Sequence, residues 1–472
     1  MPYFDPEFSD EHSFDSKEDG LDNEIKRCRD LIYDGSVYEF SESIEEVVQL
    51  CLDNDKFEDA LYFLETLLEA YPYNSENWLR KGISLNGLLR FEESLECFER
   101  ALSMNPNDAE TILNKANAEE NLGLIDVAEL SLKDALKVDP YNVDTWFNLG
   151  LLFQRQEEYS KAIGCFNKVF EFDNEFSEAL YESGYCYEIL NDLDKSLEYY
   201  DRFLELEPYN PSGWYNRGIV LVKLNQLEKA IDSYDLAIAI KDDFASAWFN
   251  KGNTLADLGR YNQAVECFKK SYSIDKYDEA SCFNIANIYE ETGDISNAIK
   301  YYSEAIKINN GYYEAYLSRG FCYDSVGKFQ SALKDFNKAV SLAKDKADGW
   351  YAKADLEYSL GKLTDAVKSY NIALKIEPAN NEIWYNLAET LFEMGDWLKA
   401  IAAYDNCIRI NPMDANSYYG KAKINFILSR TLEAVDCLKS AFLIDPSIKG
   451  EFAKEYPEVK SSKLFRKLLG EF

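Results

Sequence analysis

Ser75–Asp108 reads SENWLRKGISLNGLLRFEESLECFERALSMNPND, and versions of this stretch recur along most of the chain. Its tryptophan, Trp78, lies a multiple of 34 residues from Trp146, Trp214, Trp248, Trp350 and Trp384. Its proline, Pro106, shares its place in the same frame with Pro72, Pro140, Pro208, Pro378, Pro412 and Pro446. A frame that starts at Ser41 gives twelve repeats, numbered 1 to 12 below, which end at Ile448 without an insertion. Such a fixed period indicates a repeat array rather than ordinary globular domains.

Two positions of the repeat hold only small side chains. Position 20 is alanine or serine in every repeat: Ala60, Ser94, Ala128, Ala162, Ser196, Ala230, Ala264, Ala298, Ala332, Ala366, Ala400 and Ala434. Position 8 is glycine or alanine from repeat 2 onward: Gly82, Ala116, Gly150, Gly184, Gly218, Gly252, Ala286, Gly320, Ala354, Ala388 and Ala422. Because glycine inside a helix costs about 1 kcal/mol relative to alanine, its recurrence predicts that two helices approach closely here.

Large side chains and turn residues complete the pattern. Position 4 carries the tryptophans, and position 24 carries aromatic rings: Phe98, Phe166, Tyr200, Tyr234, Phe268, Tyr302, Phe336, Tyr370 and Tyr404. Positions 4, 8 and 11 share one helical face, and positions 20, 24 and 27 share another. Between the two predicted helices, position 15 holds glycine or asparagine in eight repeats, and both tolerate the left-handed conformation at a helix end. These residues are Gly123, Asn191, Asn225, Gly259, Gly293, Gly327, Gly361 and Gly395. Each repeat is therefore predicted to be a helix–turn–helix hairpin, and the fold all-α.

The repeat resembles the tetratricopeptide repeat family. The resemblance rests on W-L-R-K-G at 78–82, on Ser94, Phe98, Ala101 and Pro106, and on their equivalents in the other repeats. Repeat 1 departs most from the pattern, as is expected at the end of an array. The resemblance implies a right-handed superhelical solenoid of twelve 34-residue hairpins. It also implies that the first helix of each hairpin lines a concave groove, which positions 2, 5, 6, 9, 12 and 13 face.

The residues outside the repeats divide into terminal segments. Residues 1–20 hold seven acidic residues and one lysine, which predicts an acidic flexible tail. Residues 21–40 are expected to form an N-terminal helical cap before the repeats at 41–448. Residues 449–472 are expected to form capping helices, at 451–456 and 462–472, because the last apolar face of an array needs a polar cover.

The charge of the chain restricts its partners. Lys and Arg total 50 and Asp and Glu total 85, which gives a formal net charge of −35. Such a field repels phosphate backbones and anionic membrane surfaces, so we expect neither nucleic acid nor membrane as a partner. The sequence shows no secretory leader and no apolar run long enough to insert in a membrane, which predicts a cytoplasmic location. The oligomeric state stays open.

Residues with catalytic or metal-binding chemistry are scarce. His12 is the one histidine, so the repeats cannot hold a histidine-based metal cluster or a Ser–His–Asp triad. The ten cysteines form no CxxC pair, and four of them share one position of the repeat: Cys97, Cys165, Cys267 and Cys437. That recurrence favours packing roles in a reducing compartment. No nucleotide-binding motif appears. We therefore expect no enzyme activity, no catalytic residue, no metal site and no cofactor.

Asparagines gather at positions 6 and 9 of the expected groove. They are Asn114, Asn117, Asn148, Asn216, Asn250, Asn253, Asn284, Asn287 and Asn386, called the asparagine row below. An amide offers two donors and an acceptor, so such a row can pair with the backbone of an extended peptide. The arrangement resembles the asparagine ladder of O-linked N-acetylglucosamine transferases, which implies peptide binding. The alternative is that these amides bond only to adjacent repeats. The row is also interrupted, because Glu182, Ser318, Ala352 and Gly420 occupy position 6 in other repeats.

Positions 5 and 2 give two further expectations for the groove. Position 5 is mostly aromatic: Phe147, Tyr181, Tyr215, Phe249, Phe283, Tyr351, Tyr385 and Tyr419. Such rings serve packing more often than ligand stacking. Position 2 is mostly acidic: Glu76, Glu110, Asp144, Glu178, Glu314, Asp348 and Glu382. Related co-chaperones grip a peptide carboxylate with lysines at positions 2 and 5, and acids or aromatics stand there in this chain. We therefore expect basic or neutral extended segments as ligands.

Three classes of function fit the array. The leading prediction is a non-enzymatic protein–protein interaction scaffold, because stacked repeats expose extended surfaces to partner proteins. The second is a substrate-docking or regulatory subunit of a modifying enzyme such as a glycosyltransferase. The third is a self-assembling structural protein, whose end faces would stack on one another.

Overall fold

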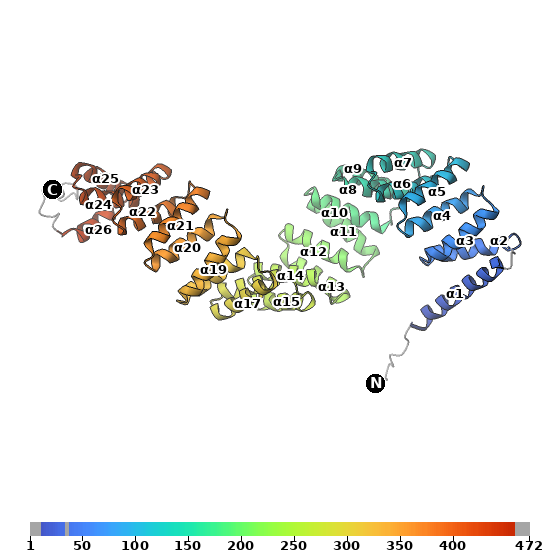
Figure 1. Ribbon diagram of the computed structural model, residues 1–472, viewed down its shortest axis with the longest axis horizontal. Coiled ribbons are helices and arrows are strands. Elements are labelled where there is room, and N and C mark those ends of the chain that lie inside the picture. The colour runs from blue at the N-terminus through green and yellow to red at the C-terminus, as the bar shows by residue number, and fades with distance from the viewer. Residues whose placement is uncertain (1–10, 34–36, 458–472) are drawn as a thin grey trace, which may run out of the picture. The chain divides into compact units, whose positions relative to one another are not determined.

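The computed structural model describes residues 11–33 and 37–457, which form 26 α-helices and no strand (Figure 1). The hairpins comprise two sets of helices. The first helices are α2 Ser41–Asp53, α4 Ser75–Gly87, α6 Ala109–Asn121, α8 Val143–Arg155, α10 Ser177–Ile189, α12 Pro211–Lys223, α14 Ala245–Asp257, α16 Glu279–Glu291, α18 Tyr313–Ser325, α20 Ala347–Ser359, α22 Asn381–Glu393 and α24 Ala415–Ile427. Every first helix begins at position 1 of the predicted repeat.

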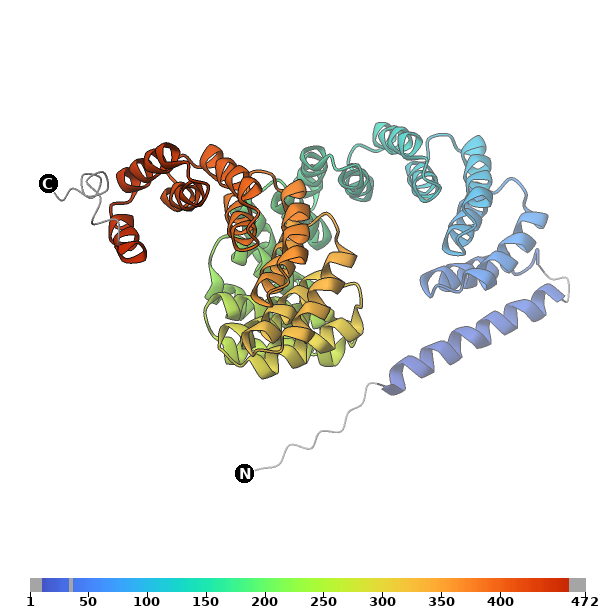
Figure 2. The same ribbon diagram turned by 60° about the vertical axis from the view of Figure 1, so that its left-hand side comes forward.

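The second helices begin at position 17. They are α3 Phe57–Ala70, α5 Phe91–Met104, α7 Ile125–Val138, α9 Tyr159–Phe172, α11 Leu193–Leu206, α13 Leu227–Ile240, α15 Tyr261–Ile274, α17 Ile295–Ile308, α19 Phe329–Leu342, α21 Leu363–Ile376, α23 Trp397–Ile410 and α25 Thr431–Ile444. The chain divides into two compact halves, Met1–Ile240 and Lys241–Phe472. Within each half, successive hairpins lie side by side, which Figures 1 and 2 both show. The predicted all-α array of twelve hairpins is confirmed.

The small residues of the repeat are where the two helices of a hairpin meet. All twelve side chains at position 20, from Ala60 to Ala434, are completely buried, each with 0% exposure. At position 8, a Cβ added to Gly150 would lie 2.4 Å from the ring of Phe166 at position 24. The same pair recurs in repeat 6, where a Cβ added to Gly218 would lie 2.5 Å from the ring of Tyr234. The glycine therefore makes room for the ring, as the sequence predicted.

The tryptophan and proline positions are linked by one hydrogen bond. The indole Nε1 of Trp146 donates to the carbonyl oxygen of Pro140 at 2.9 Å. The same bond joins the other tryptophans of this position to the residue six places before them: Trp78 to Pro72, Trp214 to Pro208, Trp248 to Asp242, Trp350 to Lys344 and Trp384 to Pro378. This bond holds the loop that ends one hairpin against the first helix of the next.

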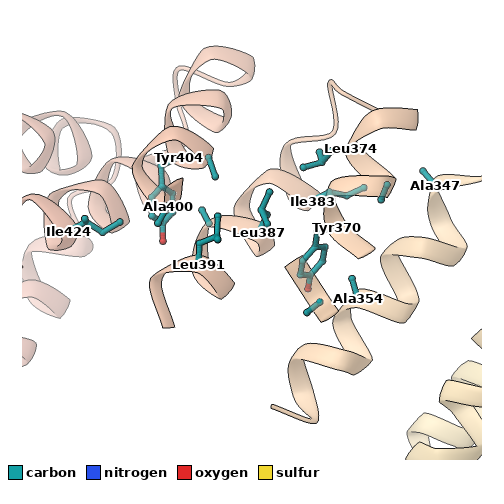
Figure 3. Close-up of a cluster of buried hydrophobic side chains, with 14 residues drawn as sticks. Ala347, Ala354, Tyr370, Leu374, Ile383, Leu387, Leu391, Ala400, Tyr404 and Ile424 are labelled. Atoms are coloured by element: carbon teal, nitrogen blue, oxygen red, sulfur yellow. The ribbon is translucent and has the colours of Figure 1, made fainter. Parts of the chain in front are cut away.

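The buried rings form contiguous clusters. Figure 3 shows one of them in the C-terminal half, where Tyr370 of repeat 10 and Tyr404 of repeat 11 are 1% and 0% exposed. Between them lie Leu387 and Leu391 of α22, so the cluster runs from one repeat into the next. A hairpin therefore buries its apolar side chains partly against its neighbour, as repeat proteins require.

The turn between the two helices has the same backbone in every repeat. All eight glycines and asparagines predicted at position 15 have a positive φ, from 57° at Asn225 to 81° at Gly293. The remaining four repeats adopt this conformation with less suitable residues: Asp55, Leu89, Glu157 and Ser429. The left-handed region costs an ordinary side chain about 1–2 kcal/mol. The packing of the flanking helices therefore imposes the turn even where the sequence does not favour it.

The two ends differ from expectation in their boundaries. Helix α1, Glu11–Tyr33, starts inside the segment predicted to be a flexible tail and extends through most of the predicted cap. The prolines nearest to it, Pro2 and Pro6, lie before its start, so no proline interrupts the helix.

At the other end, α26 spans Ile448–Glu455 and therefore begins three residues before the predicted helix at 451–456. Its Phe452 packs against the rings of Tyr419 and Phe442 in repeat 12. The second predicted helix, 462–472, lies outside the described residues.

Candidate functional site

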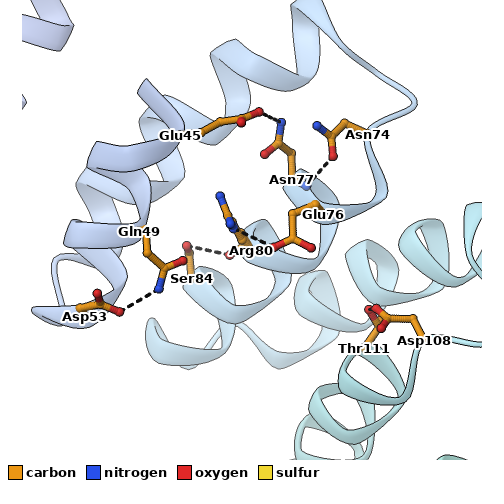
Figure 4. A network of polar contacts seen from close by, with 10 residues as sticks. All are labelled: Glu45, Gln49, Asp53, Asn74, Glu76, Asn77, Arg80, Ser84, Asp108 and Thr111. Atoms are coloured by element: carbon orange, nitrogen blue, oxygen red, sulfur yellow. Dashed lines mark hydrogen bonds and ion pairs between the residues drawn. The ribbon is translucent and has the colours of Figure 1, made fainter. Parts of the chain in front are cut away.

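Polar side chains of neighbouring first helices contact one another and form what we call the first-helix face. Its members occupy positions 2, 5, 6, 9, 12 and 13 of the repeat. Figure 4 shows its start, where Asn77 Nδ2 of α4, at the adjoining position 3, donates to Glu45 Oε1 of α2 at 3.4 Å. Beside this bond, Arg80 Nε pairs with Glu76 Oε1 at 3.0 Å. The first helices are thus joined by side-chain hydrogen bonds as well as by packing.

Two asparagines of the row are fixed by tyrosines of the preceding repeat. Asn216 Nδ2 donates to Tyr181 Oη at 2.8 Å, and Asn386 Nδ2 donates to Tyr351 Oη at 2.9 Å. Both tyrosines occupy position 5. Asn386 Nδ2 also lies 3.3 Å from Asp355 Oδ1. These contacts are the inter-repeat bonds that the sequence left open as an alternative.

Three further asparagines bond within the row or to a buried ring. Asn284 Nδ2 donates to Asn253 Oδ1 at 2.9 Å, which joins α16 to α14. Asn287 Oδ1 accepts from Tyr302 Oη at 2.7 Å. The pair Asn253/Asn284 brings together two members of the predicted row from different repeats.

The remaining members of the row differ in their contacts. Asn114 Nδ2 donates to the backbone oxygen of Glu110 at 3.0 Å, and the backbone oxygen of Asn250 accepts from Thr254 Oγ1 at 2.8 Å. The side chains of Asn117 and Asn148 make no hydrogen bond within the described part of the chain. All nine members are half-buried, so each also meets solvent.

The aromatic rings of position 5 pack on the rings of position 24. The pairs and their centroid distances are Phe147–Phe166 at 5.8 Å, Tyr181–Tyr200 at 5.8 Å, Tyr215–Tyr234 at 6.1 Å, Phe249–Phe268 at 5.5 Å, Phe283–Tyr302 at 5.5 Å, Tyr351–Tyr370 at 6.2 Å and Tyr385–Tyr404 at 6.1 Å. Each pair lies within one hairpin. Position 5 therefore serves packing, which the sequence analysis favoured over ligand stacking.

Carboxylates of this face have two kinds of partner, basic side chains and tyrosine hydroxyls. In the N-terminal half, Arg155 Nη1 pairs with Glu120 Oε1 at 2.6 Å, and Lys223 Nζ pairs with Glu188 Oε1 at 2.9 Å. In the C-terminal half, Lys346 Nζ pairs with Glu314 Oε1 at 2.7 Å, and tyrosine hydroxyls donate to other acids. They join Tyr351 to Glu382 at 2.8 Å, Tyr358 to Glu393 at 2.5 Å and Tyr370 to Asp355 at 2.5 Å. Burial raises the pKa of Asp355, although bonds from Tyr370 and Asn386 offset part of the effect.

A cavity of about 360 Å³ opens on this face between α10, α11 and α12. It is lined by Ser177, Glu178, Tyr181, Glu182, Phe203, Glu207, Asn210 and Ser212. We call it the α10–α12 pocket. The sequence analysis had named Glu178, Tyr181 and Glu182 by their positions in the repeat. It missed Phe203 and Glu207, because they come from the end of the second helix and reach this face only through the fold.

The described residues also lack two other kinds of feature. No group of three or more His, Cys, Asp or Glu side chains could hold a metal ion there. None of the described helices combines the length and the apolar character that crossing a bilayer requires. Of the ten cysteines, nine are buried and Cys437 is half-buried, and all are free thiols.

Family models match most of the array. Models described as tetratricopeptide repeat match 79–211, 199–232, 245–346 and 382–414. A model described as TPR repeat matches 220–259 and 354–395. Together they cover more than half of the chain. No curated protein matches the sequence significantly.

Solved structures similar to the chain include the following three. YrrB, described as a TPR protein with an unusual peptide-binding site, is 22% identical with a TM-score of 0.36, over 39% of this chain and 95% of its own. A tetratricopeptide repeat protein from Parabacteroides merdae is 20% identical with a TM-score of 0.37, over 50% and 93%. The APC/C hetero-tetramer Cut9-Hcn1 is 12% identical with a TM-score of 0.35, over 90% and 94%.

Proposed function

Because the chain belongs to the tetratricopeptide repeat family, we propose that it is a non-enzymatic scaffold that binds extended peptide segments of partner proteins along the first-helix face. Within each half, the face runs across successive hairpins and carries polar side chains that repeat with them. A peptide in extended conformation presents its own N–H and C=O groups at regular intervals, so a repeating polar surface suits it.

One observation carries this proposal: the asparagine row keeps hydrogen-bonding capacity after its internal bonds are made. Asn216, Asn284 and Asn386 each use the amide nitrogen, while their amide oxygens accept no hydrogen bond within the described residues. Asn117 and Asn148 keep the whole amide. Each free oxygen can accept a hydrogen bond from a peptide N–H group.

The internal bonds favour binding rather than compete with it. Tyr181 and Tyr351 hold Asn216 and Asn386 in one orientation before any ligand arrives. Ordering a side chain on binding costs about 0.5–1.5 kcal/mol. A side chain that is already ordered in the free protein avoids most of this cost. The two interpretations of the asparagines are therefore compatible, because one atom of the amide supports the fold and the other stays available.

The charge of the face selects the kind of peptide. Position 2 is acidic in most repeats, and the chain carries a net charge of −35. Acidic segments would be repelled from such a surface, whereas basic or neutral segments would not. The proposed ligands are therefore extended segments of basic or neutral character.

The test is selection of random twelve-residue peptides on the full chain, followed by measurement of Kd by fluorescence anisotropy. A variant with Asn148, Asn216, Asn284 and Asn386 changed to alanine is compared with one that changes Asn167, Asn262, Asn337 and Asn371 on second helices. Each lost hydrogen bond contributes about 0.5–1.5 kcal/mol, so we expect binding at least about tenfold weaker in the first variant only. Equal affinity of both variants would place the binding surface elsewhere.

A further inference from the structure

The second helices α17, α19 and α21 of the C-terminal half carry an excess of positive charge. Together they hold six lysines against three acidic residues, and no arginine. Helices α17 and α19 both pack on α18, and α19 and α21 both pack on α20, so the three follow one another along the array (Figure 1). The lysines are exposed, and we call them the lysine face: Lys300, Lys307, Lys334, Lys338, Lys368 and Lys375.

The spacing of these lysines places them on the same side of their helices. Position 22 is lysine in repeats 8, 9 and 10, as Lys300, Lys334 and Lys368. The other three follow at intervals of four or seven residues, with Lys338 at position 26 and both Lys307 and Lys375 at position 29. Steps of four and seven residues return to one face of a helix. Because equivalent positions of successive hairpins lie beside one another, the six ammonium groups share one surface.

The positive charge is local, since the chain as a whole has a net charge of −35. The equivalent helices of repeats 1 and 2, α3 and α5, hold eight acidic residues and one arginine. Position 18 shows the contrast, because it is Glu58 in α3 and Glu92 in α5. In α17, α19 and α21 the same position is uncharged, as Ser296, Gln330 and Thr364. Solvation of an exposed second helix therefore does not require it to be basic.

The acids of α17 and α21 each neutralise a single lysine. Lys307 Nζ pairs with Glu304 Oε1 at 2.6 Å, and Lys368 Nζ pairs with Asp365 Oδ1 at 2.9 Å. Each of these two helices keeps a second lysine, at position 22 in α17 and at position 29 in α21, which forms no ion pair within the described residues. Part of the positive charge of both helices is therefore left for a partner.

The acid of α19 does not serve the lysine face at all. Asp335 is 3% exposed, and its two oxygens accept from Arg319 of α18 at 2.7 and 2.8 Å. Lys334 and Lys338 therefore form no ion pair within the described part of the chain. They stand four residues apart, where like charges destabilise a helix. A carboxylate bound between them would relieve this repulsion.

The lysine face suits carboxylates better than the phosphates of a nucleic acid. An ammonium group is a compact charge that can pair with a single carboxylate, whereas guanidinium groups, which bind phosphate through two parallel hydrogen bonds, are absent from the face. Double-stranded DNA carries a charge about every 1.7 Å of its axis, so it would extend beyond six lysines onto a chain that repels it. A short acidic segment of a protein can end where the lysines end.

We propose that the lysine face binds an acidic segment of a partner protein. Charge complementarity carries the proposal, because six exposed lysines lie on successive second helices and four of them have no internal counter-charge. The surface is formed by second helices and is separate from the first-helix face, so this inference does not depend on the peptide binding proposed above. A chain with both surfaces would hold partners of opposite charge on different helices.

The test uses a labelled twelve-residue peptide of alternating glutamate and serine, whose binding to the full chain is measured by fluorescence anisotropy. A control peptide has glutamine in place of every glutamate, and a third probe is a twelve-nucleotide oligothymidylate. The lysine-face variant is Lys300→Gln, Lys334→Gln, Lys338→Gln and Lys375→Gln. The control variant removes the same charge from exposed lysines of N-terminal second helices that already have an acidic partner, as Lys133→Gln, Lys137→Gln, Lys168→Gln and Lys195→Gln.

We expect the glutamate peptide to bind the natural chain and the control variant alike. Its binding to the lysine-face variant should be at least about tenfold weaker, because four exposed ion pairs of small individual strength are lost together. The affinity should fall as salt is added, since salt screens such pairs, and the glutamine peptide should not bind. Both variants should keep the urea midpoint of the natural chain, because all the changed lysines are exposed.

Equal affinity of the glutamate peptide for all three proteins would overturn the proposal. Oligothymidylate that binds the natural chain as tightly as the peptide does, and is lost in the lysine-face variant, would assign the face to nucleic acid instead. Sedimentation velocity tests the remaining occupant, a second copy of the chain. Self-association of the natural chain that disappears in the lysine-face variant would show that the acidic helices of another copy cover the face, and would also overturn the proposal.

Discussion

Single side chains on the first-helix face use one atom for an internal hydrogen bond and leave another atom open. Asn216 gives its nitrogen to Tyr181 at 2.8 Å and leaves its oxygen free. Glu182 shows the cost of such a surface, because it is half-buried with a single hydrogen bond and no cation. A binding surface needs groups that are not fully satisfied in the free protein, and these groups reduce stability.

Glu182→Gln should therefore stabilise the free protein. Burial raises the pKa of Glu182 in the folded state above its ordinary value of 4.5, so folding disfavours the ionised form. The penalty is absent well below the unfolded-state pKa, grows as the pH rises through the folded-state pKa, and is complete at neutral pH. We expect the free energy of unfolding in urea to increase at pH 7, by less than about 1 kcal/mol because solvent screens a half-exposed group.

The comparison is Glu198→Gln, which removes an exposed charge from α11 and should change little. At a pH well below 4.5 the advantage of the Glu182 variant should disappear. An advantage of equal size at both pH values would mean that the effect does not come from ionisation of Glu182.

At the scale of the element, the hairpin is a self-contained unit of geometry. Position 20 lets the helices meet, position 8 admits the ring of position 24, and position 15 reverses the chain with a positive φ. Leu89 shows that this geometry is imposed by packing, because it holds a φ of 60° although leucine disfavours that region. It is also 73% exposed, so its side chain adds little to the core.

Leu89→Gly should stabilise repeat 2. Glycine adopts a positive φ without steric cost, whereas an ordinary residue loses about 1–2 kcal/mol, and the greater unfolded-state entropy of glycine offsets part of this gain. We expect a net increase of about 0.5–1 kcal/mol in the free energy of unfolding, measured by urea denaturation. The control is Gly327→Leu in repeat 9, where φ is 73° and the change should be destabilising. A loss of stability in Leu89→Gly would show that the leucine side chain makes a contact of its own.

At the scale of the whole molecule, stability passes from each hairpin to its neighbour. Clusters such as the one around Tyr370 and Tyr404 join adjacent repeats. A repeat at either end of the array has a neighbouring repeat on one side only. Helix α1 covers the first hairpin: Leu21, Ile25 and Cys28 are buried in one cluster with Ile44 and Val48. We propose that α1 is the N-terminal cap of the array and α26 the start of the C-terminal one.

Ile25→Ala should weaken this cap. Ile25 is 7% exposed, and truncation of a buried isoleucine to alanine costs about 2–5 kcal/mol. Because repeats are coupled mainly to their nearest neighbours, the loss should be local. In hydrogen exchange of the full chain, protection should fall most in α1 to α3 and recover with each following repeat. A uniform fall of protection across the N-terminal half would show that the half opens as one cooperative unit.

The sequence alone determined the repeat length, the helix–turn–helix plan of each hairpin, the close approach at positions 8, 20 and 24, and most of the left-handed turns. It could do so because each feature depends on residue types that lie within one hairpin and recur twelve times. Only the tertiary structure decided which asparagines are held by tyrosines and where a pocket opens. The partner of Asn216 lies 35 residues away in another hairpin, and Glu207 joins Glu178 in the pocket lining only when α11 packs beside α10 and α12. Such contacts depend on how side chains of different repeats meet, which a pattern read along one chain does not specify.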